Sequence, residues 1–383
     1  MILLIPNRLW HPDQYWSERH SLLVDESNGM IKALLRKDAE PVTETRLIKG
    51  SLIPGFVNAH CHLELSHLFR KIPTRTGMRS FVQAVNQLRN QTTLEAEQHA
   101  IQEADKRMWE EGIVAVGDIS NDQRSLVTKK HSKIYYHTFL EVFGWNTSRA
   151  TQMLEQAKES VELFHSFGSA SIVPHAPYSV PPSLFNSIRA IDQGLKTWTI
   201  HHAESDAEVE LFATLTGDLA NFLQSIGVVL HPSIFENHTS PTSYTLSQWP
   251  IDRRSIWVHN TRMTAADFKL ADQVLKRNLF LCTCPNANLY IEDKLPDYNM
   301  WLRNGAQVCI GTDSLASNHS LSVWDEVKTL LNETDLNLET ILPWTNINGA
   351  RALGIENKFG TLEAGKAPGI ICVDDLQNIQ RLF

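Results

Sequence analysis

Histidine stands out among the residues that could do chemistry, both in number and in position. The chain of 383 residues has 16 histidines, and two of them, His60 and His62, follow an apolar run that begins at Leu52. Residues two apart on a strand point to the same side, so both imidazoles can face one point while Cys61 faces away. Two imidazoles at this spacing can share a metal ion, although the pair alone is a weak signal.

Three further apolar runs end in groups that could join such a site. These groups are His201, His202 and Glu204 around the end of 198–202, His259 at the end of 255–259, and Asp313 after 308–312. Four strand ends that carry histidine or aspartate favour a metal centre over buried polar residues of the core. Imidazole and carboxylate ligands suit Zn²⁺ or Fe²⁺.

The elements that must position these groups alternate between short apolar strands and helices. The helix expected over 94–111 is the clearest, because Ile101, Ala104 and Met108 share one face and Gly112 suits a C-terminal cap. Eight strands that alternate with helices predict a closed parallel barrel, in which active groups sit at the C-terminal ends of the strands. The eight runs are 52–58, 113–118, 134–142, 171–174, 198–202, 255–259, 279–283 and 308–312.

Segments of β character at both ends predict a second, smaller domain. The N-terminal part reads as short strands separated by turns such as Asn28-Gly29, and β character returns at 370–373. We therefore expect a small domain formed by residues 1–52 and 355–383, and a barrel over 53–354. The stretch 203–254 is too long for one helix and a turn, which predicts extra helices and a loop over the site.

Composition and charge narrow the choice of partners. Lys and Arg number 35 and Asp and Glu number 43, so the net charge is −8, which argues against a nucleic acid polymer and favours a small-molecule substrate. Five cysteines without a CxxC pair indicate a reducing compartment. The N-terminus lacks the pattern of a signal peptide, and no run approaches the ~18 apolar residues of a spanning helix. We expect a cytoplasmic protein with no membrane partner.

The motifs around these groups resemble the amidohydrolase superfamily, and more narrowly its branch of nucleoside and aminopurine deaminases, which also holds chlorohydrolases. The similarity runs from about Ser51 to GTLEAGKAPG near the C-terminus. It rests on PGFVNAHCH, VPHAPYSV, IHHAES, WVHN, CPNANL and GTDSLASNHSL. It implies a distorted (β/α)8 TIM barrel with a small β-sandwich formed by both termini. Members of this family are often homodimers.

The resemblance also assigns the metal ligands position by position. It implies His60 and His62 of the HxH motif, His201, which stands three residues before Glu204 as in the family's HxxE, and Asp313. The adjacent His202 competes with His201, but strand alternation turns it to the opposite side. Members with two metals add a carboxylated lysine, commonly from strand four, and 171–175 contains no lysine. One divalent ion is therefore expected, with Zn²⁺ favoured and Fe²⁺ as the alternative.

The remaining groups take roles in a hydrolytic deamination. A divalent metal lowers the pKa of a bound water to about 7, and Glu204 is the expected shuttle that protonates the ring nitrogen and the departing ammonia. His259 is expected to orient the water or stabilise charge, and Asp313 to accept a hydrogen bond from the water. His175 in PHAPYS lies where relatives contact substrate. Glu64 continues the alternation of the HxH pair toward a ribose or ring nitrogen, with a loop salt bridge as an equal alternative.

The substrate is less sharply defined than the reaction. Adenosyl-type deaminases of this branch often hold the ribose hydroxyls with a Trp and a Glu after strand one, and the loop IPTRTGMRSFVQAVNQLR has neither. HLELSH followed by TGMRSFVQAV is more similar to aminodeoxyfutalosine deaminases, and Arg70, Arg75 or Arg79 could bind a carboxylate of such a substrate. An adenosine derivative is the other nucleoside considered. A hydrolase of a triazine-like or cyclic amide ring, and a non-catalytic binding relative, are the alternatives from other classes.

Overall fold

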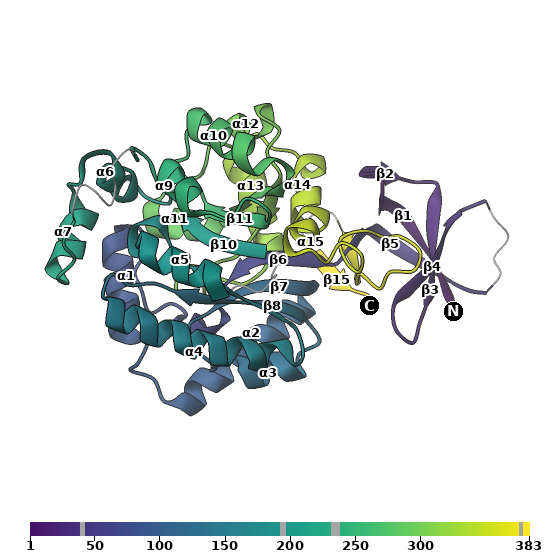
Figure 1. Cartoon of the computed structure of the whole chain (residues 1–383). Coiled ribbons are helices and arrows are strands. Elements are labelled where there is room, and N and C mark those ends of the chain that lie inside the picture. Colours follow the sequence, from purple (N-terminus) through teal and green to yellow (C-terminus); the bar gives the residue numbers. More distant parts are fainter. Residues whose placement is uncertain (39–42, 192–196, 231–237, 375–377) are drawn as a thin grey trace.

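Two parallel four-stranded sheets form the centre of the molecule (Figure 1). The computed structural model describes residues 1–38, 43–191, 197–230, 238–374 and 378–383. Each sheet follows the chain order, as expected for successive βα units. The first sheet contains β6 (Phe56–Cys61), β7 (Ile113–Ser120), β8 (Tyr135–Val142) and β9 (Ser169–Pro174), and the second contains β10 (Thr197–His202), β11 (Arg254–His259), β12 (Leu279–Thr283) and β13 (Val308–Ile310).

Backbone contacts join the two sheets at both edges. Beyond β9, the His201 amide donates to the carbonyl of His175 at 2.9 Å. Beyond β13, the amides of Thr312 and Asp313 donate to the carbonyl of His60 at 2.9 and 3.1 Å. The C-terminal end of the fourth strand, β9, is therefore held against that of the fifth, β10, and the end of the eighth, β13, against that of the first, β6.

Helices cover the outside of these strands, and the strands themselves are buried along almost their whole length. Strands buried on both faces read as continuous apolar runs, which explains why the sequence revealed them. The helices are α1 (Gly77–Leu88), α2 (Leu94–Glu110), α3 (Leu126–His131), α4 (Thr147–His165), α5 (Pro182–Ile191), α6 (Asp206–Thr214), α7 (Asp218–Ser225), α9 (Pro241–Gln248), α10 (Ala265–Leu275), α11 (Pro285–Glu292), α12 (Tyr298–Arg303), α13 (Val323–Glu333), α14 (Leu338–Thr345) and α15 (Ile347–Leu353). Short 3-10 turns lie at η1 (Leu63–Leu68), η2 (Pro177–Ser179) and η3 (Lys276–Asn278).

Both termini contribute to one seven-stranded sheet beside this body (Figure 1). The order is β15-β14-β5-β1-β3-β4, with β2 paired to β1. Its apolar face has a core of its own, which includes Leu4, Leu22 and Leu52 from the N-terminal part and Leu362 and Ile370 from the C-terminal part. The strands are β1 (Ile2–His11), β2 (Tyr15–Ser17), β3 (His20–Asp25), β4 (Met30–Arg36), β5 (Glu44–Pro54), β14 (Ile370–Asp374) and β15 (Asn378–Arg381).

These observations confirm the predicted α/β fold with parallel strands. The run 52–58 proves to be two strands, because the backbone at Gly55 leaves β5 and enters β6. The extra helices expected in 203–254 are α6, α7 and α9, whereas residues 231–237 of that stretch lie outside the described residues. Across the described parts of the chain, no helix is long and apolar enough to cross a bilayer.

Candidate active site

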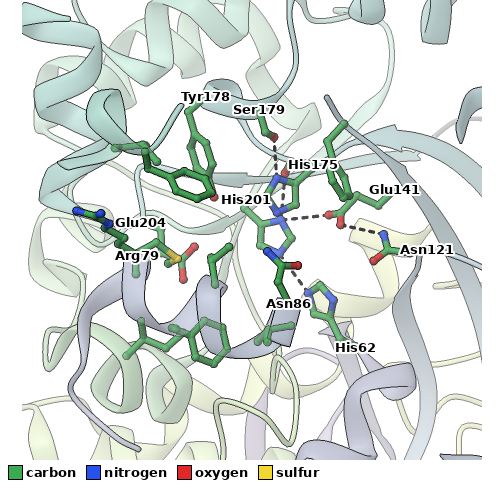
Figure 2. Close-up of a pocket in the computed structure, with 18 of the residues that line it drawn as sticks. His62, Arg79, Asn86, Asn121, Glu141, His175, Tyr178, Ser179, His201 and Glu204 are labelled. Atoms are coloured by element: carbon green, nitrogen blue, oxygen red, sulfur yellow. Dashed lines mark hydrogen bonds and ion pairs between the residues drawn. The ribbon is translucent and has the colours of Figure 1, made fainter. Parts of the chain in front are cut away.

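The C-terminal ends of the strands open into a pocket of about 320 Å³ (Figure 2). Polar groups on one part of its wall come from the strand ends, and apolar groups on another part come from helices. The polar lining includes His62, Asn121, Glu141, His175, His201, Glu204, His259 and Asp313. The apolar lining includes Phe81, Val82 and Val85 of α1 and Leu219, Phe222 and Leu223 of α7.

Ligand-type atoms of four predicted residues converge at the pocket floor. His62 Nε2 lies 3.2 Å from His201 Nε2 and 3.4 Å from Asp313 Oδ1, and His60 Nε2 lies 3.7 Å from the same oxygen. His60, His201 and Asp313 are buried, and His62 is slightly more exposed. The other carboxylate oxygen of Asp313 accepts a hydrogen bond from the Ser317 hydroxyl at 2.6 Å, which fixes the orientation of the carboxylate.

The backbone explains how these groups come together. His60 and His62 flank Cys61 at the end of β6, so strand alternation sends both toward the same point. Asp313 follows β13 in a left-handed conformation with φ 56°, and its amide is tied to the carbonyl of His60. At Gly311 an added Cβ would lie 2.7 Å from the Cβ of His60, so only glycine permits this close approach.

This cluster fits a metal ion of the expected kind. Both ring nitrogens of His60 are buried without a hydrogen-bond partner in the described structure, which is costly unless another ligand satisfies them. Tetrahedral Zn²⁺ with bonds of ~2.0–2.1 Å sets its ligands about 3.3 Å apart, close to the observed 3.2–3.7 Å. Among the described residues, a second group of neighbouring ligand-type side chains consists of Glu141, His175 and His201, and it shares His201 with the first.

The neighbours of His201 and His202 separate these two candidates. His201 Nδ1 lies 3.0 Å from the carbonyl of His175 and 3.3 Å from Glu141 Oε1. Both partners are acceptors, so Nδ1 carries the hydrogen and Nε2 presents its lone pair to the cluster. His202 points the other way and contacts Asn260 Oδ1 at 2.9 Å through Nδ1 and Thr242 Oγ1 at 3.2 Å through Nε2. The structure thus brings His201, and not His202, to the cluster.

Glu204 and His259 lie together beside the cluster. Glu204 Oε1 is 3.4 Å from His259 Nε2, and His259 Nδ1 is 2.8 Å from Asn288 Oδ1. Burial raises the pKa of Glu204 well above its usual value, against the opposing effect of His201. Burial lowers the pKa of His259 to about 4. The pair therefore combines a carboxyl group that burial shifts toward its protonated form with a neutral imidazole.

Charge within the cluster is divided unevenly. Burial lowers the pKa of His60 and of His62 to about 4. Burial would also lower the pKa of His201, but Glu141, Glu204 and Asp313 outweigh it and raise that pKa to about 9. Burial would raise the pKa of Asp313, yet the surrounding imidazoles hold it well below its usual value. An anionic carboxylate and neutral imidazoles are the forms in which these groups bind a cation, so a metal ion would have to displace the proton that His201 holds at neutral pH.

His175 and Glu64 occupy different kinds of position. His175 lines the pocket, and its Nδ1 lies 2.7 Å from the Ser179 hydroxyl. Glu64 does not continue the strand alternation, because β6 ends at Cys61 and Glu64 belongs to η1. Its side chain is buried behind the pocket, where Oε2 accepts from the Asn121 amide at 2.9 Å and Oε1 lies 3.5 Å from Arg89 Nη2. Burial raises the pKa of Glu64 to about 7.

Sequence reasoning missed several polar groups of the pocket wall, among them Glu141, Asn121 and Arg89. Glu141 could have been found, since it stands at the end of an apolar strand run like the other site residues. Asn121 directly follows β7 and carries the same signal, whereas Arg89 follows helix α1 and has no such signal. Asn288 of α11 holds the ring of His259.

The three arginines after strand one do not act together. Of the three, Arg79 lines the pocket and lies 3.8 Å from Asp218 of α7. Arg75 pairs with Asp293 at 3.1 Å, and Arg70 lies over the ring of Phe69. A carboxylate in the pocket can therefore meet Arg79 and Arg89 but neither of the other two.

Comparisons with known proteins show the family and the fold to which this chain is similar. The model of the amidohydrolase family matches residues 51–383. An adenosine deaminase of Helicobacter pylori is 30% identical over 324 residues, which cover 82% of this chain and 76% of that protein. An aminofutalosine deaminase structure from Helicobacter pylori, in complex with methylthio-coformycin, has a TM-score of 0.82 at 24% identity and covers 98% of this chain and 93% of that one. A zinc-bound adenosine deaminase structure from Xanthomonas campestris has a TM-score of 0.78 at 22% identity, covering 97% and 84%.

Proposed function

The chain belongs to the amidohydrolase family, and from this premise we propose that it is a metal-dependent hydrolytic deaminase of aminopurine nucleosides. The observation that carries the proposal is the convergence of His60, His62, His201 and Asp313 beside Glu204 in one pocket. The relative that is 30% identical is an adenosine deaminase, which supports the same reaction class. A 6-aminodeoxyfutalosine-type nucleoside and an adenosine derivative are the two substrates that we consider first.

The metal ion is proposed to be a single Zn²⁺ bound by His60, His62, His201 and Asp313. Three imidazole nitrogens and one carboxylate oxygen are a donor set that Zn²⁺ favours and that Fe²⁺ also accepts. When bound, such an ion supplies a water molecule activated at neutral pH. Ser317 and the His175 carbonyl orient two of the ligands from behind.

The other groups take roles according to their positions. Glu204 gives a proton to the ring nitrogen, takes a second proton from the attacking water and passes it to the departing amine; burial raises the pKa of its carboxyl well above the usual value, which favours the protonated form that this role needs. His259, fixed by Asn288, stabilises the charge that develops at the attacked carbon. His175 presents its ring to the substrate from the end of β9. Glu64 acts on the substrate through Arg89 and Asn121, which line the pocket in front of it.

The architecture is proposed to follow the same family pattern. The two parallel sheets would form one distorted (β/α)8 barrel over residues 53–354, and the terminal sheet would curve into a small β-sandwich from residues 1–52 and 355–383. The edge hydrogen bonds at His175 and His60 support the first proposal. The separate core shared by Leu22 and Leu362 supports the second. The substrate is expected to be a small molecule bound in the barrel pocket.

A substrate panel tests the proposed function directly. The zinc-loaded enzyme is incubated with adenosine, 5′-methylthioadenosine, S-adenosylhomocysteine and 6-aminodeoxyfutalosine, and ammonia is measured. A triazine and a cyclic amide are included for the alternative reaction, with metal-stripped enzyme as the control. Ammonia from at least one nucleoside, lost after metal removal, is the expected result. Turnover of a triazine or an amide ring without ammonia from any nucleoside contradicts the proposal.

A further inference from the structure

A buried carboxylate, Glu141, faces the pocket from the third strand. It is the penultimate residue of β8, its exposed fraction is 4%, and it lines the pocket (Figure 2). Neither the metal cluster nor the proton shuttle uses it. Buried charges need partners, so this carboxylate calls for an explanation.

The orientation of the His201 ring does not explain why a carboxylate is present at position 141. His201 Nδ1 lies 3.0 Å from the carbonyl of His175, nearer than the 3.3 Å to Glu141 Oε1. The same carbonyl also accepts the His201 backbone amide, so strand and ring are both anchored to it. The ring therefore keeps its orientation without the carboxylate.

The hydrogen-bonding capacity of Glu141 is largely unused. An ionised carboxylate offers about four acceptor sites. Within the described residues, the contacts of Glu141 are His201 Nδ1 at 3.3 Å and Asn121 Nδ2 at 3.4 Å, both long for hydrogen bonds to a charged group. The backbone amide of Asn121 donates to Glu64 Oε2 at 2.9 Å. The side-chain oxygen of Asn121 lies 3.5 Å from Arg89 Nη2. The wall is thus a supported row of polar groups with an acceptor open toward the pocket.

The position of this row fits the sugar of a nucleoside. Glu204 lies on one side of His201 and Glu141 on the other (Figure 2). The purine edge that reacts must lie at Glu204 and His259, which places the glycosidic end away from them. Given the proposed function, on which this inference rests, we infer that Glu141 accepts hydrogen bonds from the 2′- and 3′-hydroxyls of a substrate ribose. Glu141 would thereby replace the missing glutamate after strand one.

A cycle of enzyme and substrate changes tests this assignment. Wild type and Glu141→Gln are assayed for ammonia release from adenosine and from 2′,3′-dideoxyadenosine. Zinc content is measured for each protein, and binding of coformycin and 2′-deoxycoformycin is measured by calorimetry. Glu155→Gln, an exposed carboxylate of α4, is the matched control. The glutamine variant keeps the side-chain volume, so folding is expected to persist.

The expected result is a loss of kcat/KM on adenosine of about 10- to 100-fold in Glu141→Gln, since each hydrogen bond to a charged group has about that effect. The loss on the dideoxy substrate should be less than about threefold, with zinc content unchanged. Equal losses on both substrates, or a loss of zinc, overturn the assignment. If wild type releases no ammonia from any aminopurine nucleoside, the proposed function is wrong, and this inference, which rests on it, is wrong as well.

Discussion

Replacing Glu204 by glutamine separates proton transfer from metal binding. Glutamine has nearly the same shape, and the backbone contacts of this position do not depend on the side chain: the Thr261 hydroxyl donates to the carbonyl, and the amide donates to Glu208. The side-chain contact that changes is the one to His259 Nε2 at 3.4 Å. No atom of the four proposed metal ligands loses a partner, so Glu204→Gln should fold and retain zinc.

The size of the effect follows from what remains near the ring nitrogen. A positioned general acid–base group contributes about 10²–10⁴ to the rate, or about 2.7–5.4 kcal/mol at 1.36 kcal/mol per decade. His259, whose Nε2 lies 3.4 Å from Glu204 Oε1, is neutral at pH 7 because burial lowers its pKa to about 4. It cannot replace the lost acid, so we expect a decrease of kcat near 10⁴.

The assay measures kcat from ammonia release at pH 7 together with zinc per chain. Glu155→Gln is again the control for removal of one negative charge, and it should match wild type in both readings. A Glu204→Gln enzyme with full zinc and a kcat within tenfold of wild type would refute the assigned shuttle. Loss of zinc in that variant would instead mean that Glu204 supports the metal site.

Three further predictions concern metal binding and stability. His201→Ala should lose zinc while His202→Ala keeps it, as measured by metal analysis, and the reverse result would mean that the register of β10 is misassigned. Lys129→Met should lower the unfolding free energy by about 3–5 kcal/mol in urea titrations, because Asp118, 2.6 Å from Lys129 Nζ and fully buried, would lose its counter-charge; a change below about 1 kcal/mol contradicts this. Burial raises the pKa of Glu326 to about 8 from a usual 4.5, so the unfolded state releases this proton first and stability should fall from pH 5 to 8. Glu326→Gln should reduce this decrease of the unfolding free energy between pH 5 and 8. An unchanged slope would show that Glu326 does not cause the decrease.

The strands were predictable because each is buried on both faces and therefore apolar throughout. Helix ends are less predictable: the sequence over 338–353 does not reveal that this segment is divided into α14 and α15 at Asn346. Asn346 has φ −138° and ψ −84°, and its side chain accepts from the Ile347 amide. A side chain that competes for a backbone donor in this way does not change the spacing of apolar residues. The hydrophobic periodicity therefore does not reveal the break between the two helices.

The candidate site was predictable where a group follows a strand and not where it depends on a distant partner. His60 and His62 needed only the alternation of one strand. Glu141 and Asn121 stand at strand ends and could have been found in the same way, whereas Arg89 follows α1 and meets Asn121 only because the fold brings the two segments together. The predicted position of Glu64 was wrong for a different reason. Strand alternation was applied beyond the end of β6, although Glu64 belongs to the 3-10 turn η1.

The turn after β10 explains why alternation alone could not have placed Glu204. Strict alternation would put Glu204 on the side of His202, away from His201. Ala203 instead adopts a left-handed conformation with φ 45°, which reverses the direction of the next side chain and brings Glu204 into the pocket. For a residue with a Cβ this conformation costs roughly 1–2 kcal/mol. The Arg262 amide, which donates to the Ala203 carbonyl at 2.9 Å, helps to hold it. Strain at a strand end is thus the local cause that sets the proton shuttle beside the metal ligands.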